Sequence, residues 1–440
     1  MLCYRRVVRR NLNAILAVAV AVSGLRAARA AEVTRVVAGS RGPGDLVDVQ
    51  LSLGWTHQSR KAAIKREIEG QATGGQIALR NDLIFRQTRD ALRLRADVGV
   101  WRDLSLFIAA PLVLADDRSL DFDRSRCGTA GASDCVDENN ATILRDGILP
   151  GAGAPSYGLD SPHQRPFQRP SETVFRGPTR KGLEYLALGA SYALLNQDRD
   201  FTHPTWIVRF EARLAVGGDM RFDPQHAGAN SAVGPGFHQL VLTSIFSRRL
   251  WTLEPYLGGW YLLPVAKSDG PLAREVLGKG AADSPQHRAG ADFGIEAVVW
   301  DDARSQRRIT FELGGRLELR MFGLEQGPLW EPLAGAAACP KDKTACRRDL
   351  DTDLNGDMMV DPNPGTTRSP AYGILGGQAG LAVRSGRYLR FRGLFALAYE
   401  QDHFLSDGFS GRDIYELPGR RFRLEDGVSW SFLVEGGLLF

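Results

Sequence analysis

An acidic segment between positions 349 and 361 is the part of the chain best suited to metal chemistry. Side-chain oxygens recur there at alternate positions, with Gly356 placed for a sharp turn. This spacing gathers oxygens around one hard cation such as Ca²⁺. Pro362 stands where a closing bidentate Glu would be expected, so we predict only a simple structural calcium loop, with a solvated acidic loop as the alternative. The candidate ligands are Asp349, Asp351, Asp353, Asn355, Asp357 and Asp361.

Four of the five cysteines form two close pairs. Cys127 lies near Cys135 and Cys339 lies near Cys346, whereas Cys3 falls in the first thirty residues. Pairing within each segment costs the least loop-closure entropy, and an export route is oxidising. We therefore expect two local disulfides. Zinc is the alternative, but the spacings are not Cys-x-x-Cys and no His lies close to either pair.

No catalytic set can be recognised among the other titratable residues. The seven His residues are scattered, and no Gly-rich phosphate loop, metal-binding His pair or nucleophile elbow occurs. A Ser/His or His/carboxylate dyad would have to be assembled by the fold. We predict that the protein is not an enzyme, and a hydrolase is the lesser alternative.

Charged residues instead recur at every second position, with apolar residues between them. The segments 92–100, 206–216 and 309–320 follow this pattern closely. A period of two gives a strand one apolar face and one polar face. The polar-face residues that we take as candidates for a solute filter are Arg80, Asp82, Arg86, Arg93, Arg95, Asp97, Arg209, Glu211, Arg213, Glu312, Arg316, Glu318, Arg320, Arg390 and Arg392.

The strands and their connections are those expected of a membrane barrel rather than a soluble sandwich. Many segments alternate for more residues than the 5 or 6 or so that are common in soluble strands, and a tilted membrane strand needs about 9–11. Short turns also alternate with long connectors rich in Gly, Pro and Asp, as in outer-membrane barrels. The long connectors are 115–181, 218–236, 264–287, 322–370 and 402–426.

The fold predicted is all-β: a single antiparallel up-and-down transmembrane β-barrel with short periplasmic turns and long extracellular loops. We count about 14 strands, or 12 if the weakest segment, 61–69, and one neighbour are not strands. Trp101, Trp206, Trp251 and Trp300 then lie at the periplasmic rim, where aromatic rings prefer to be. The predicted strands are 46–56, 61–69, 76–87, 91–101, 104–114, 182–195, 205–217, 237–247, 251–263, 288–300, 308–321, 371–383, 388–401 and 427–440.

Residues 1–30 have the features of a secretory signal. Four Arg residues precede an apolar stretch from Leu12 to Val22, and Ala28, Arg29 and Ala30 form a small-residue cleavage site. The segment holds six Arg and no acid, so its removal changes the formal net charge from +4 to −2 and gives no support for a nucleic-acid partner. We expect cleavage near Ala30, a periplasmic segment 31–45 and a barrel 46–440 in the outer membrane, in contact with its lipid.

The last segment alternates from Val428 to the final residue, Phe440. It resembles the carboxy-terminal strand that Gram-negative outer-membrane β-barrels present to their insertion machinery, and the whole mature chain resembles that class. The segment 98–106, followed by Pro111, resembles the strand-turn-strand of transporter-like barrels for aromatic or hydrophobic compounds. Fatty-acid transporters of that kind carry an amino-terminal plug, for which the segment before the first strand is short.

The function that these features predict is a passive, porin-like channel for small solutes. The charged face would line the lumen, since a Lys or Arg facing lipid at mid-membrane costs about 2–4 kcal/mol. Opposed Arg and acid ladders would then sort solutes by charge and size. A lumen plugged by Arg–carboxylate pairs is the alternative, and it would make the protein a non-conducting structural or surface-interaction barrel.

Overall fold

The computed structural model describes the strands and part of the loops. The described residues are 48–68, 75–125, 175–222, 230–268, 284–302, 304–336, 365–406 and 421–440, with 34, 127, 136, 270, 272, 418 and 419 as single residues. The expected signal segment 1–30 lies outside them. So do the expected calcium loop and the pair Cys339 and Cys346. None of the described helices is long and apolar enough to cross a membrane.

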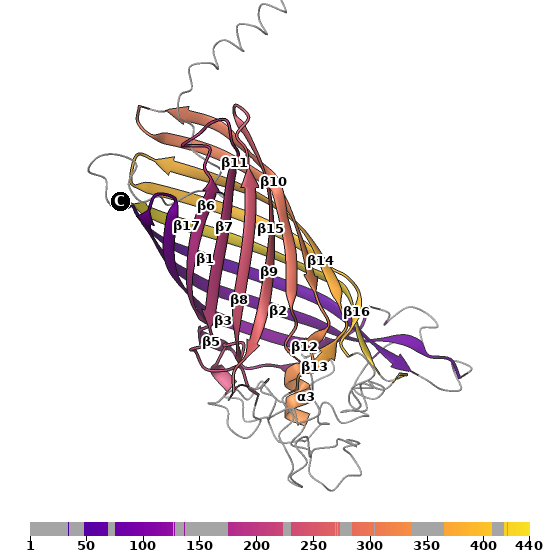
Figure 1. Ribbon diagram of the computed structural model, residues 1–440. Coiled ribbons are helices and arrows are strands. Elements are labelled where there is room, and N and C mark those ends of the chain that lie inside the picture. Colours follow the sequence, from indigo (N-terminus) through magenta and orange to yellow (C-terminus); the bar gives the residue numbers. More distant parts are fainter. Residues whose placement is uncertain are drawn as a thin grey trace, which may run out of the picture.

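Twelve antiparallel strands form a closed barrel in which the first strand, β1, pairs with the last, β17 (Figure 1). Each strand otherwise pairs with its neighbours in the chain, which makes the topology up-and-down. The barrel strands are β1 (Val49–Ile68), β2 (Ala78–Trp101), β3 (Leu104–Phe122), β6 (Leu186–Leu195), β7 (Thr205–Leu214), β8 (Phe237–Ser247), β9 (Leu253–Ala266), β10 (Arg288–Asp302), β11 (Arg307–Arg320), β14 (Tyr372–Ser385), β15 (Leu389–Glu400) and β17 (Phe422–Leu439).

The barrel has 12 strands, the smaller of the two expected numbers, rather than 14. The four segments predicted between 46 and 101 are two long strands, β1 with 20 residues and β2 with 24. Their pairing runs without interruption from Val49 opposite Val98 to Ile64 opposite Leu83. The polar residues near 57–60 and 87–90, which look like turns in the sequence, continue these strands.

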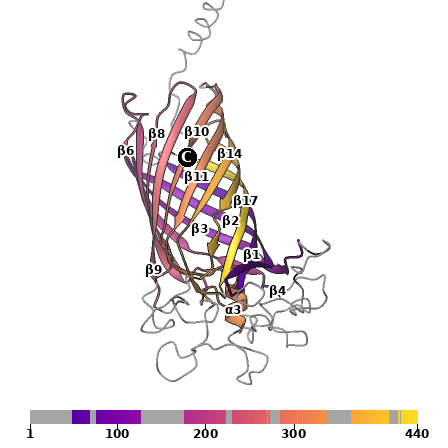
Figure 2. The ribbon, with the colours of Figure 1, turned by 90° about the vertical axis from the view of Figure 1, so that its right-hand side faces the viewer.

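Short connections lie at one end of the barrel, which we call the turn end, and long ones at the other, the loop end (Figure 2). Outer-membrane barrels place the short turns in the periplasm. Several tight turns hold one residue with positive φ, including Arg102 (42°) and Gly386 (70°). Trp101, Trp251 and Trp300 are exposed beside these turns, at 56%, 87% and 46%. The fourth expected rim residue, Trp206, lies at the start of β7, where it is partly exposed and stacks on Phe246.

The outer face of the barrel is apolar along most strands, as contact with lipid requires. Outward side chains such as Leu94, Leu257, Phe311 and Leu397 are about half exposed. Their neighbours in sequence point inward and are polar, for example Arg95 and Glu312. This arrangement is that of a transmembrane barrel, with the hydrophobic face toward lipid and the polar face toward the lumen.

At the loop end the pattern is inverted. There β1 to β3 turn apolar side chains inward, and these pack on a cap that contains helix α3 (Trp330–Ala336) (Figures 1 and 2). The cap region also holds the short strands β4 (Phe175–Arg176), β5 (Arg180–Leu183), β12 (Gly323–Glu325), β13 (Thr367–Ser369) and β16 (His403–Phe404). At the loop end, β1 to β3 therefore follow the pattern of a soluble protein, with apolar side chains facing the interior.

Candidate channel lumen

Strand alternation places most of the predicted filter residues on the inner face of the barrel. Leu92 and Leu94 face lipid, so Arg93, Arg95 and Asp97, which lie on the other face of the strand, point inward. The same holds on β7, where the outward Phe210 is flanked by inward Arg209 and Glu211. The residues placed inward are Arg93, Arg95, Asp97, Arg209, Glu211, Arg213, Glu312, Arg316, Glu318, Arg320, Arg390 and Arg392.

Three predicted filter residues do not line the membrane part of the lumen. Arg86 lies directly opposite Lys61 and shares the outward face of β2 with Leu94. Its guanidinium pairs with Asp121 on β3. Arg80 and the buried Asp82 lie in the loop-end part of β2, where the alternation shifts at an irregularity between Asn81 and Leu83. The expectation failed because it assigned the apolar face to lipid, whereas at this end that face packs against the cap.

One wall of the lumen near the turn end is built around Phe107 on β3. The Arg95 guanidinium lies over its ring at 3.9 Å and pairs with Asp97 at 2.6 Å. Arg209 lies 5.9 Å from the same ring and donates from Nε to the Ser191 hydroxyl at 3.1 Å. Farther along β7, Arg213 forms an ion pair with Glu211 at 2.6 Å. This wall carries more guanidinium groups than carboxylates.

The opposite wall is organised around the buried carboxylate of Glu312. It accepts hydrogen bonds from the Tyr256 hydroxyl at 3.2 Å, from Gln378 at 2.8 Å and from Arg392 at 2.5 Å. Arg390, which lies on β15 with Arg392, binds Glu435 at 3.2 Å. These contacts join β9, β11, β14, β15 and β17 across the lumen wall. Near the turn end, therefore, a substantial part of the interior is occupied by side chains.

The middle of the lumen is more open. Gln58, Arg93 and Arg316 point inward from near the middle of β1, β2 and β11, yet their side chains are exposed. Arg316 lies over the Trp260 ring at 5.0 Å and near Glu318 and Asp292, at 3.5 and 3.8 Å. An inward side chain can be exposed only where it borders solvent-accessible space.

A second polar network lies in the lumen near the loop end. Arg320 contacts Glu318 at 3.1 Å, Glu325 at 3.0 Å and the Tyr372 hydroxyl at 2.8 Å. The Tyr372 ring is stacked on His403, with centroids 3.6 Å apart. Arg60 on β1 donates hydrogen bonds to both carboxylate oxygens of Glu400 on β15, at 2.9 and 2.7 Å. The network ties β1, β11, β12, β14 and β15 together at the base of the cap.

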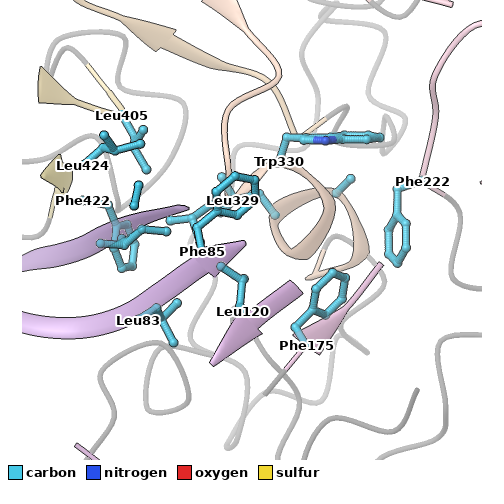
Figure 3. Close-up of a cluster of buried hydrophobic side chains, with 14 of the residues drawn as sticks. Leu83, Phe85, Leu120, Phe175, Phe222, Leu329, Trp330, Leu405, Phe422 and Leu424 are labelled. Carbon is cyan, nitrogen blue, oxygen red and sulfur yellow. The ribbon is translucent and has the colours of Figure 1, made fainter. Parts of the chain in front are cut away.

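The apolar core of the cap lies on the loop-end side of this network (Figure 3). Phe85 and Leu120 from the barrel face Leu329 and Trp330 from the helical segment. Trp330 is 1% exposed. The neighbouring Glu331 pairs with the fully buried Arg180 at 2.8 Å, and Arg180 also donates to the carbonyl oxygens of Ala232 and Arg221. A packed core with a buried ion pair therefore covers this end of the lumen.

Several charged residues of the lumen were not among the sequence candidates. Arg288, Asp292 and Glu296 recur at every fourth position along β10, with Asp292 opposite Arg316 and Glu296 opposite Glu312. Glu254 on β9 accepts a hydrogen bond from Ser247 at 2.9 Å. The period of two in residues 288–296 would have identified the β10 residues, because Gly290 and Gly294 fill the positions between them. Because glycines separate the charged residues on this face of β10, the face does not show the regular alternation of charged and apolar residues.

The expected local chemistry in the loops can be examined only in part. Cys127 is disulfide-bonded, but its partner is outside the described residues, so its pairing with Cys135 stays a prediction. Within the described ranges no group of three or more His, Cys, Asp or Glu side chains is placed to hold a metal ion. Of the expected periplasmic segment 31–45 only Thr34 is described, and it lies buried with its hydroxyl 2.5 Å from that of Ser247.

The closed barrel, its lipid-facing belt and its charged lumen define the class: this is an outer-membrane β-barrel protein. No family model and no curated protein matches the sequence. Among solved structures, an outer-membrane channel from Pseudomonas putida is 11% identical over 91% of this chain and 100% of its own, with a TM-score of 0.41. A FadL homologue from Pseudomonas aeruginosa is 9% identical over 90% of each chain, with a TM-score of 0.32. The outer-membrane protease OmpT from Escherichia coli is 9% identical over 90% of this chain and 96% of its own, with a TM-score of 0.29.

Proposed function

We propose that this protein is a passive channel for small solutes, with a preference for anions. The observation that carries the proposal is the exposure of the inward side chains Gln58, Arg93 and Arg316 in the middle of the barrel. Polar side chains around a solvent-accessible space make a path that hydrated solutes can use. Passage requires the packed side chains at the two ends of this space to move.

The preference for anions follows from the wall that contains Phe107. Four guanidinium groups, those of Arg93, Arg95, Arg209 and Arg213, share this wall with two carboxylates, Asp97 and Glu211. Among the described residues Arg93 makes no ion pair or hydrogen bond, and the hydrogen-bond partner of Arg209 is the neutral Ser191. In a narrow lumen, unbalanced positive charge raises the local concentration of anions.

A non-conducting barrel is the second candidate, and a specific observation favours it. Phe107, Tyr256 and Glu312 point inward, and each is only 4% exposed. Narrow barrels fill with side chains, while wider ones leave room for a channel. In this case the ion pairs would serve stability, and the protein would act through its external surface.

Single-channel recording of the full-length protein, purified from outer membranes, separates the two candidates. We expect stepwise conductance with an anion-selective reversal potential under a KCl gradient. Arg93→Gln should reduce this selectivity without unfolding the barrel, because the described structure gives Arg93 no carboxylate partner to leave unpaired. Arg307→Gln, which removes an exposed charge at the turn end, is the matched control.

A second variant tests whether the packed interior is the barrier. Tyr256→Ala should raise the conductance because it removes a large ring from the lumen wall. If the wild type and Tyr256→Ala both migrate as folded barrels but stay silent, the channel proposal is wrong and the structural role replaces it.

A further inference from the structure

The outer wall formed by β1 and β2 changes character along its length. Because the two strands pair in register, their outward side chains form a ladder of cross-strand pairs. From the lipid belt toward the loop end these pairs are Leu53 with Leu94, Trp55 with Leu92, His57 with Asp90, Ser59 with Thr88, and Lys61 with Arg86. The ladder therefore passes from aliphatic to hydrogen-bonding to cationic residues.

The polar part of this ladder lies beside lipid-facing residues on the neighbouring strand β17. On β17, Trp430 is the partner of Ser59 and Val428 is the partner of Lys61, and both are exposed. On β3, the exposed Leu112 lies opposite Leu92, at the apolar end of the ladder, whereas Asp117 and Ser119 lie opposite Thr88 and Arg86. The polar strip thus borders the rim of the apolar belt on its β17 side. Polar side chains that face hydrocarbon are costly, so this strip calls for a polar occupant.

The cationic pair at the loop end of the strip indicates an anionic occupant. Lys61 and Arg86 lie directly opposite each other, an arrangement that is unfavourable for like charges. Arg86 is paired with Asp121, but its side chain is still 51% exposed. Lys61 is exposed and has no ion-pair or hydrogen-bond partner among the described residues. A phosphate group bound between the two cations would relieve their repulsion.

The middle of the strip is suited to a sugar. Nδ1 of His57 lies 3.0 Å from Oδ1 of Asp90, and both side chains are partly exposed. The His57 ring lies 5.1 Å from that of Trp430 and 6.1 Å from that of Trp55. Thr88 is exposed next to them. Aromatic faces beside hydroxyl, imidazole and carboxylate groups can hold a saccharide ring and its hydroxyl groups.

We propose that the outer wall of β1 and β2 is a binding site for a phosphorylated glycolipid of the outer leaflet. Its phosphate binds Lys61 and Arg86, its sugar lies along His57, Asp90 and Thr88, and its acyl chains follow Trp55, Leu92 and Leu94 toward the membrane centre. The order of groups along the ladder is the order of groups in such a lipid. The site is on the outside of the barrel and does not depend on whether the lumen conducts.

Native mass spectrometry of the full-length protein with added lipid tests the proposal. The probes are bisphosphorylated lipid A, its monophosphoryl form and phosphatidylglycerol, which carries a phosphate but no sugar. We expect the wild type to retain bisphosphorylated lipid A best. Lys61→Gln/Arg86→Gln should weaken that binding at least about tenfold, since each surface cation favours an anionic lipid by roughly 1 kcal/mol.

The control removes the same charge elsewhere. Arg304→Gln/Arg307→Gln changes two exposed cations at the turn end and should leave lipid A binding unchanged. His57→Phe/Asp90→Leu makes the middle of the strip apolar and should reduce the preference for lipid A over phosphatidylglycerol. A heat-dependent gel shift verifies that each variant is folded.

Three outcomes would overturn the proposal. Equal lipid A binding by the wild type and Lys61→Gln/Arg86→Gln would show that the cations do not hold the phosphate. Equal binding of lipid A and phosphatidylglycerol would mean that no sugar is recognised. Displacement of the lipid by millimolar inorganic phosphate would indicate a simple anion site.

Discussion

The ring of Phe107 on β3 lies over Gly189 on the neighbouring β6, where a Cβ atom would overlap it. Two other inward rings are arranged in the same way. Trp260 lies over Gly290, and Tyr256 lies over both Gly294 and Gly314. Glycines on the inner face therefore let large rings lie flat against the wall of the lumen.

Adding a methyl group at Gly189 should destabilise the barrel. Gly189→Ala forces the Phe107 ring away from the wall, and overpacking of this kind costs about 1–3 kcal/mol. The temperature at which the folded band disappears on a gel should fall. Gly189→Ala combined with Phe107→Leu should recover only part of the loss, because the smaller side chain makes room on one side while the methyl group still crowds the backbone carbonyl oxygen of Phe210. A double variant no more stable than Gly189→Ala would contradict this packing.

Breaking the buried pair of Arg180 and Glu331 should loosen the cap. Arg180→Met leaves Glu331 uncompensated, and removal of one partner of a buried pair costs about 3–5 kcal/mol. Limited proteolysis of the protein in detergent should then cut the loop end faster. Arg180→Met/Glu331→Leu should be less susceptible than Arg180→Met alone. If the double variant is cut faster than either single variant, the pair does not act as a unit.

The carboxylate of Glu67 should give the loop end an acid-sensitive contact. Burial raises the pKa of Glu67, but hydrogen bonds from Arg421 and from the backbone N–H of Gly419 outweigh this and lower it from the ordinary value. Stability from this contact is therefore complete above the unfolded pKa of about 4.5 and is lost as pH falls through the lower folded pKa. Hydrogen exchange near Arg421 should increase in that range. Glu67→Gln should show the faster exchange already at pH 7.

His403 should respond to pH in a different range. Burial against Tyr372 lowers the pKa of this imidazole from about 6.5, so the folded state resists protonation. Stability should be greatest above pH 6.5 and fall as pH drops through 6.5 toward the folded pKa. His403→Phe keeps a ring against Tyr372 but cannot titrate, and should lose this dependence. Thermal unfolding at several pH values between 5 and 8 measures it, and an unchanged pH profile in His403→Phe would exclude His403 as the source.

The barrel could be predicted from the sequence because its lipid-facing positions are uniform. The residues from Val208 to Leu214 obey one rule, apolar outward and polar inward, and the same rule identified Arg209, Glu211 and Arg213 as inward residues. The rule depends on lipid. Where lipid surrounds the strand, the period of two gives both the strand and its orientation.

The strand number and the loop end could not be predicted in the same way. Near His57 on β1 and Asp90 on β2 the outer face turns polar, and in sequence this change looks like a turn. Past that point Phe85 faces inward because the distant Trp330 covers it. Nothing local to residues 78–90 encodes the presence of that cap.

The closure of the barrel also constrains how it can form. β17 pairs with β1 from Leu439 opposite Gln50 to Phe422 opposite Arg66. Until the last residues of the chain have been exported, β1 has an open edge, with backbone groups available to any other strand. The pairing that removes this hazard joins the two most distant parts of the barrel sequence and carries a large loop-closure entropy. Protection of β1 by a chaperone should therefore be needed until the carboxy-terminal strand arrives.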